Sequence, residues 1–315
     1  MTRRRIIAAA AGVLATGAAI AAAAALSRGR ADRGTTGTPE IGSFANGMAY
    51  GRVGTGPRTL LSIPGGPGNQ APSATWMRSS AAWYRPFTDA GYSAWNVTRK
   101  QGMPAGHTMA DIADDYAELI RTTFGGRVDI VVGTSLGGLV ALYLAARHPD
   151  LFGAVAVVAA AAHVTEEAAA ADRVFAGHLA AGRYGEAAVT LAAFVAPGVP
   201  RQLVRIIGGI LGPLMFRGVH EQFASDVLVE AEAEAAGDAT AILPSIRVPV
   251  LLVVGDEDGY FPLSAVEETA RLIPGCILLI RHGHGHMRVA SDPDVAREVL
   301  RFVAARTVVD RPRPA

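Results

Sequence analysis

In the run VVGTSLGGLV, Ser135 lies between two glycines, Gly133 and Gly137. Residues 128–132 before it are mostly apolar and β-branched, and residues 136–148 after it form a helical pattern with apolar residues on all sides. A serine at such a strand-to-helix turn has a strained backbone and an exposed hydroxyl, and glycines two residues away prevent clashes with the neighbouring strand and helix. This spacing is typical of a nucleophile. A turn without chemistry, which needs only one glycine, is the alternative.

A serine hydroxyl is a weak nucleophile that needs a base, and the base needs an acid to orient it. After a turn of this kind the acid comes first in the chain and the histidine second. The apolar run VPVLLVV ends in Gly-Asp-Glu-Asp. Asp258 is the predicted acid, because Asp256, beside a glycine, is expected to cap the turn. The last apolar run, CILLI, leads into three histidines, of which His286 is the predicted base.

The alternating histidines His282, His284 and His286 also resemble a metal site. No cysteine or further histidine lies near them, so we predict no metal and no other cofactor, and interpret His282 and His284 as loop residues that shape the entrance. The single cysteine, Cys276, excludes an internal disulfide. Within CILLI it is interpreted as a small, buried apolar residue.

Two backbone N–H groups are predicted to form an oxyanion hole. The first belongs to Leu136, where the helix after the serine begins. The second is expected in the glycine-rich loop Pro64-Gly65-Gly66-Pro67-Gly68, which follows a predicted strand. Gly66 is the predicted donor, since the loop glycines allow the peptide to turn inward. A phosphate-binding loop is excluded, because no lysine follows and no helix is immediately downstream.

Six short apolar runs, with helical patterns between them, predict the fold that positions these residues. The runs are mostly continuous rather than alternating, as expected of strands covered on both faces. One helix begins at Thr108, which with Asp111 resembles a capping box, and ends at Gly125-Gly126. This alternation indicates an α/β fold with a mostly parallel central sheet flanked by helices. The predicted strands are residues 59–63, 92–97, 128–132, 154–159, 248–254 and 276–280.

Residues 163–243 interrupt this alternation. The stretch is Ala-rich, has no convincing strand and lies between two predicted core strands, so it is predicted to be an inserted helical cap. Its apolar residues either line a lid that accepts an apolar substrate or pack the cap on the core. These residues are Ile206, Ile207, Leu211, Leu214, Met215 and Phe216.

Residues 1–33 are predicted to be an export signal or a membrane anchor, which takes no part in the fold. Three arginines precede 21 uncharged residues, Ile6 to Leu26, a length that can cross a bilayer as a helix. This segment is only weakly hydrophobic, because it is mostly Ala and Gly, and with the arginines it resembles a twin-arginine export signal. We therefore expect the catalytic domain outside the cytoplasm, after a linker at residues 34–42.

The charge of the chain argues against nucleic-acid binding. Six of the 29 Lys and Arg residues, and one of the 28 Asp and Glu residues, lie within the first 33 positions. The remainder therefore carries 23 basic and 27 acidic residues, a balance of −4. A nucleic-acid-binding domain needs a basic patch on its folded body, so no such partner is predicted.

Four segments together resemble the α/β-hydrolase superfamily over about residues 43–306. In that family the corresponding segments carry the oxyanion loop, the nucleophile, the acid and the histidine, in this order. The resemblance implies a core of residues 43–162 and 244–306, a cap at 163–243 and a tail at 307–315. The segments are IPGGPG (63–68), GTSLGG (133–138), GDEDGYFP (255–262) and GHMRVASDP (285–293).

By this resemblance, Ser135, Asp258 and His286 form a catalytic triad, and Gly66 and Leu136 supply the oxyanion hole. It implies hydrolysis of carboxylic esters or related acyl compounds, with a small-molecule substrate and no cofactor. A serine at this turn disfavours epoxide hydrolase and dehalogenase chemistry, whose family members place an aspartate there.

The chain departs from the family pattern at two places. Many members have His-Gly where this chain has Pro64-Gly65, and that histidine usually braces the oxyanion loop. The family also often has an aspartate before the arginine. Here the arginine, Arg99, is kept, but Thr98 stands in place of the acid.

Three alternative functions remain open. Within the family they are a cofactor-free perhydrolase and an aminopeptidase similar to proline iminopeptidases. An aminopeptidase would need acids in the cap to bind the substrate amine, and Glu221, Asp226 and Glu230 are candidates. The third is a non-catalytic ligand-binding protein that kept the fold, which predicts an intact pocket with a broken triad.

Overall fold

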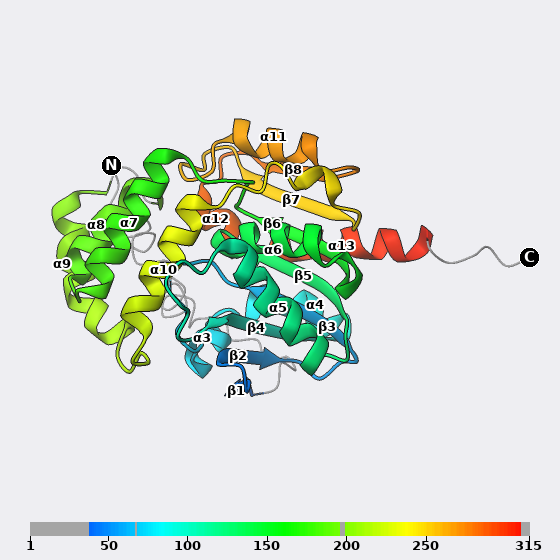
Figure 1. Cartoon of the computed structure of the whole chain (residues 1–315), viewed down its shortest axis with the longest axis horizontal. Helices are drawn as coiled ribbons and strands as arrows, with labels where there is room; N and C mark the ends of the chain where they lie inside the picture. The colour runs from blue at the N-terminus through cyan, green and yellow to red at the C-terminus, as the bar shows by residue number, and fades with distance from the viewer. Residues whose placement is uncertain (1–37, 67, 196–198, 310–315) are drawn as a thin grey trace, which may run out of the picture.

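The computed structural model describes residues 38–66, 68–195 and 199–309. The predicted export or anchor segment, residues 1–33, lies outside them. Within the described ranges, no helix has both the length and the apolar character that a membrane span requires. The centre of the molecule is an eight-stranded sheet with the order β1-β2-β4-β3-β5-β6-β7-β8 (Figure 1).

The predicted α/β fold with a mostly parallel sheet is confirmed. All six predicted strands are present, as β3 to β8, and neighbouring members of this set pair in parallel. Two further strands, β1 and β2, pair antiparallel at one edge. The strands are β1 (Glu40–Ser43), β2 (Met48–Val53), β3 (Arg58–Ile63), β4 (Tyr92–Lys100), β5 (Val128–Thr134), β6 (Phe152–Val158), β7 (Val250–Gly255) and β8 (Ile277–Arg281).

The first strand falls partly within a stretch that the sequence predicts to be a linker. The predicted linker covers residues 34–42, but β1 begins at Glu40. The strand is only four residues long and has no apolar run, so its own sequence carries no strand signal. Pairing with β2 forms it, and an ion pair between Glu40 and Arg52 joins the two strands.

Helices connect the strands and continue beyond the last one. The capping box predicted at Thr108 is confirmed: its hydroxyl accepts from Asp111 N at 3.2 Å, and Asp111 Oδ2 accepts from Thr108 N at 2.9 Å. The final helix extends into residues 307–309, which belong to the predicted tail. The helices are α3 (Ala74–Ser79), α4 (Ala81–Asp89), α5 (Met109–Thr123), α6 (Leu136–Arg147), α7 (Glu166–Ala180), α8 (Tyr184–Val195), α9 (Arg201–Met215), α10 (Phe223–Ala236), α11 (Leu263–Leu272), α12 (His286–Ser291) and α13 (Pro293–Val309).

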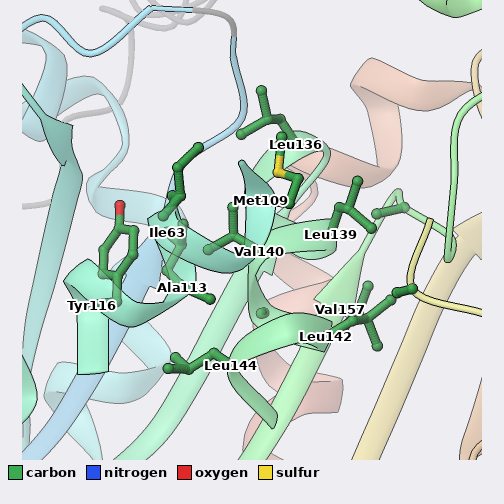
Figure 2. Packing of buried hydrophobic residues seen from close by; sticks show 14 of the residues in the cluster. Ile63, Met109, Ala113, Tyr116, Leu136, Leu139, Val140, Leu142, Leu144 and Val157 are labelled. Carbon is green, nitrogen blue, oxygen red and sulfur yellow. The ribbon is translucent and has the colours of Figure 1, made fainter. Parts of the chain in front are cut away.

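Both faces of the sheet are buried under helices, which explains why the strands are continuously apolar. Leu61 and Ile63 of β3 belong to one hydrophobic cluster, together with side chains of α5 and α6. Leu60, which points to the opposite face, belongs to a second cluster with side chains of α4 and α13. Figure 2 shows the first cluster, in which Leu139 of α6 and Met109 of α5 take part.

Four helices, α7 to α10, lie between β6 and β7 in the chain and to one side of the sheet, in the left part of Figure 1. We refer to them as the cap helices. Ile206 and Leu214 of α9 are 50% and 67% exposed, so these two side chains do not pack the cap on the core. Phe216 does pack within the cap, since its ring stacks on Tyr184 with 5.3 Å between centroids.

Two buried carboxyl groups interact where α7 packs on α10. Asp172 and Glu234 are each 1% exposed, and neither Asp172 Oδ2 nor Glu234 Oε1 has a hydrogen-bond partner among the described residues. Burial raises the pKa of Asp172 to about 7, although Arg173 opposes the shift. Burial, and then the charge of Asp172, also raise the pKa of Glu234. Between the ordinary pKa of 3.8 and the raised pKa of about 7, Asp172 therefore keeps a proton in the folded cap that it releases in the unfolded chain.

This proton uptake predicts a pH-dependent stability that depends on Asp172. Because the pKa of Asp172 rises from 3.8 to about 7 on folding, the group destabilises the fold progressively as pH rises through this range. We expect Asp172→Asn to remove the effect. The difference in thermal midpoint between Asp172→Asn and wild type, measured by circular dichroism, should increase from pH 4 to pH 7 and then level off. The exposed Glu267→Gln is the control, and an equally flat difference for both variants would contradict the prediction.

Candidate active site

The predicted site residues converge at one edge of the sheet. Ser135 follows β5, the loop 64–68 follows β3, Asp258 follows β7, and His286 begins α12 after β8. These four strands are parallel, so their carboxyl ends share an edge. Ligand sites of open α/β sheets are found at this edge.

Ser135 occupies a strained turn between β5 and α6. Its φ of 53° and ψ of −126° lie in a region that costs a residue with a side chain on the order of 1–3 kcal/mol. A Cβ on Gly133 would lie 2.2 Å from the carbonyl oxygen of Gly137, and a Cβ on Gly137 would lie 2.2 Å from that of Ile63. The two glycines therefore allow α6 to start directly against the ends of β5 and β3.

A hydrogen-bonded chain joins Ser135, His286 and Asp258. His286 Nε2 lies 3.1 Å from Ser135 Oγ, and His286 Nδ1 lies 2.9 Å from Asp258 Oδ2. The other carboxylate oxygen of Asp258 accepts from the backbone N–H groups of Tyr260 and Phe261 at 2.9 and 3.1 Å. An ionised Asp258 only accepts, so it selects the tautomer with the proton on Nδ1. The lone pair on Nε2 is then free to accept the serine proton.

The other acid and the other histidines of these loops point elsewhere. Asp256 bonds His282 Nδ1 at 2.7 Å, and this hydrogen bond lowers the pKa of its carboxyl group. His284 Nε2 lies 3.7 Å from a carboxylate oxygen of Asp292. Of the two candidate acids, Asp258 is the one against His286. In the part of the chain that the structure describes, no group of three or more potential ligands could hold a metal ion.

Cys276 is only partly buried, which corrects its interpretation as a buried core residue. It lies just before β8, with Sγ 3.7 Å from the carbonyl oxygen of Ile277. Burial of the thiol nevertheless raises its pKa to about 11. The thiol is therefore protonated at neutral pH and is a poor nucleophile.

The loop after β3 lies directly against the serine. A Cβ on Gly65 would lie 3.2 Å from Ser135 Cβ and 3.8 Å from Ser135 Oγ. A Cβ on Gly66 would lie 3.1 Å from Leu136 Cδ1. The two residues predicted as oxyanion donors, Gly66 and Leu136, are thus neighbours beside the serine.

Arg99, at the end of β4, braces this loop from the core. Its side chain is fully buried and donates to three carbonyl oxygens: Nη1 to Pro64 at 2.6 Å and Gly65 at 3.1 Å, and Nη2 to Gly68 at 2.8 Å. The remaining donors bond Glu230 of α10. An arginine therefore braces the loop in a chain that lacks the usual histidine. This bracing role of Arg99 is not predicted from the sequence, where the available signal was an arginine at the end of a buried strand.

The chain is similar in sequence to known hydrolases. The sequence model of the alpha/beta hydrolase family matches residues 60–299. The chain belongs to this family. The pimeloyl-(acyl-carrier protein) methyl ester esterase of Neisseria meningitidis serogroup A is 34% identical over 223 residues, which are 66% of this chain and 68% of the relative. The 2-(acetamidomethylene)succinate hydrolase of Mesorhizobium japonicum is 26% identical over 204 residues, 64% of this chain and 72% of the relative.

A solved structure agrees with this alpha/beta hydrolase assignment. The esterase from Exiguobacterium antarcticum superposes with a TM-score of 0.64 at 20% identity, over 84% of this chain and 99% of its own. Identity this low establishes a shared fold only. The sequence relatives are themselves an esterase and a hydrolase, and they support hydrolase activity for this chain.

The close approach at the serine turn predicts that Gly137→Ala is destabilising. Its Cβ would meet the backbone oxygen of Ile63, which no flexible side chain can relieve. We expect a loss of about 1–3 kcal/mol in the free energy of unfolding, measured by urea denaturation.

The matched control is Gly177→Ala in α7, where an added Cβ meets nothing within 4 Å. This variant should gain up to about 1 kcal/mol, because alanine favours a helix over glycine. Equal stability of the two variants would show that the turn has room for a side chain.

Proposed function

We propose that this alpha/beta hydrolase is a serine esterase that cleaves carboxylic esters of small molecules through an acyl-enzyme. The observation that carries the proposal is the chain of contacts from Ser135 Oγ to His286 and from His286 to Asp258, at 3.1 and 2.9 Å. The methyl ester named for the Neisseria relative makes short alkyl esters the first substrates to test. We also propose that residues 1–33 export or anchor the enzyme.

In the first half of the reaction, His286 Nε2 takes the proton of Ser135 as Oγ attacks the ester carbonyl carbon. The carbonyl electron pair moves to oxygen, and the N–H groups of Gly66 and Leu136 stabilise the oxyanion. Each such donor contributes on the order of 10²–10³ in turnover. The pair then re-forms the carbonyl, the bond to the alcohol oxygen breaks, and His286 gives its proton to the departing alcohol.

In the second half, water replaces the alcohol. His286 takes a proton from water as the oxygen attacks the acyl-enzyme, and the same N–H groups stabilise the second oxyanion. The bond to Ser135 Oγ breaks, the serine regains its proton from His286, and the carboxylic acid leaves. Asp258 stabilises the imidazolium in both halves and holds the ring in its tautomer.

Two of the alternatives lose support from contacts in the cap and at the triad. Asp226 accepts from the backbone N–H groups of Gly102 and Met103 at 2.8 Å each, and Glu230 is paired with Arg99. These two candidate acids are already satisfied by the core, so they are poor ligands for the substrate amine that an aminopeptidase binds. The third candidate, Glu221, is exposed. A binding protein with a broken triad is disfavoured by the intact chain of contacts.

The first prediction of this proposal concerns the serine. The full chain should react with a fluorophosphonate probe at one site per molecule, because an activated serine attacks phosphorus as it attacks an ester. Ser135→Ala and His286→Ala should not label, as read by intact mass. A folded wild-type protein that fails to label would exclude the esterase and favour a binding function.

The second prediction separates the two neighbouring acids. Asp258→Asn should lower kcat for a p-nitrophenyl ester by about 10⁴-fold, because the amide imposes the wrong tautomer on His286. Asp256→Asn is the matched control on the same loop. Asp256 is hydrogen-bonded to the exposed His282 rather than to His286, so kcat of Asp256→Asn should stay near that of wild type. Similar losses in both variants would contradict the assignment of Asp258.

A further inference from the structure

Cap helix α10 points a stripe of acids into the protein. Asp226, Glu230 and Glu234 are spaced four residues apart, and each is at most 1% exposed. Glu234 interacts with Asp172 inside the cap, as described above. The other two acids bond loops of the core beside the active site, so charged groups as well as apolar contacts hold this helix in place.

Glu230 completes the hydrogen bonding of Arg99. The guanidinium has five N–H donors, and five bonds are present: three go to loop carbonyls and two to Glu230, from Nε at 2.8 Å and Nη2 at 3.1 Å. Burial lowers the pKa of Arg99, but the charge and hydrogen bonds of Glu230 outweigh this and leave the pKa raised. Without Glu230, a buried positive charge would lose its counter-ion.

Glu230 also binds the oxyanion loop directly, since its Oε2 accepts from the N–H of Gly68. Gly66 lies inside this arrangement. A Cβ on Gly66 would be 2.8 Å from Arg99 Nη2 and 3.3 Å from Glu230 Oε2, with Leu136 on another side. The proposed oxyanion donor is therefore enclosed between the ion pair and the start of α6.

Asp226, one helical turn before Glu230, holds the far end of the same loop. Its carboxylate accepts from Asn69 Nδ2 at 2.7 Å, in addition to its bonds to the segment after β4. Asn69 in turn donates to the carbonyl oxygen of Lys100 at 2.8 Å. Helix α10 thus holds both Gly68 and Asn69, the two residues at which the loop leaves the site.

We propose that Glu230 is a positioning residue that makes the oxyanion hole depend on the docking of cap helix α10. Through Arg99 and Gly68 it fixes the loop that carries the Gly66 N–H, although it does not itself touch the reacting atoms. Displacement of α10 would remove the counter-ion of Arg99 and release the loop. The inference rests on the proposed esterase function and adds a requirement that the cap be docked during turnover.

The decisive variant is Glu230→Gln, which keeps the shape of the side chain and removes its charge. We expect kcat per active site for a p-nitrophenyl ester to fall about 10–100-fold, because displacing a donor by about 1 Å lowers the rate by that factor. KM should change less than about threefold. Active sites are counted by end-point fluorophosphonate titration. A purely structural role would reduce the number of sites and leave kcat per site unchanged.

The control is Glu232→Gln on the same helix. Glu232 is an exposed acid paired with Arg173, and kcat per site of this variant should equal that of wild type.

If Glu230→Gln does not fold, Glu230→Asp tests the same role, because aspartate keeps the charge but has a side chain too short to reach Gly68 in the same way. It should lose at least about threefold in kcat per site. An inactive wild type would refute the esterase itself. An active wild type with unchanged kcat per site in Glu230→Asp or Glu230→Gln would overturn the positioning role alone.

Discussion

The strained turn at Ser135 is the constraint around which the rest of the structure is arranged. A positive φ at a residue with a side chain persists only where the surroundings leave no alternative. Here the surroundings are the buried helix α6, the parallel strands on both sides, and the glycines that let the backbones meet. Ser135 N donates to Val158 O of β6 at 2.9 Å, so the neighbouring strand also holds the turn. The hydrophobic core thereby keeps the hydroxyl at the carboxyl end of the parallel strands.

Parallel pairing brings together residues that are far apart in the chain. Ser135 and His286 are separated by 151 positions, yet both follow strands whose carboxyl ends meet at one edge. The acid lies at the same edge because β7 pairs between β6 and β8. A loop after each strand then needs only a few residues to reach the serine. The sheet therefore fixes the relative positions of the side chains, and the loops supply the chemical groups.

Buried charges of the cap helices are compensated in two different ways. Arg99 and Glu230 are fully buried and satisfy each other and the oxyanion loop, so removing either partner would leave a charge without compensation. Among the described residues, Asp172 and Glu234 form no ion pair, and burial raises the pKa of both carboxyl groups. The first pair connects the cap to the proposed catalytic site. The second makes the packing of the cap sensitive to pH, because ionisation of both groups would place two like charges together.

Features that depend on local pattern are predictable from the amino-acid sequence alone. Continuous apolar runs predicted the six parallel strands, and glycines two residues on each side predicted the tight turn at Ser135, because both are properties of neighbouring residues. Which polar groups meet depends on how distant parts of the chain pack together. Arg99 and Glu230 are 131 positions apart, and no local pattern marks them as partners. Similarly, β1 exists only because β2 is there to pair with it. Long-range contacts follow from how the elements pack, which the sequence of each element does not contain.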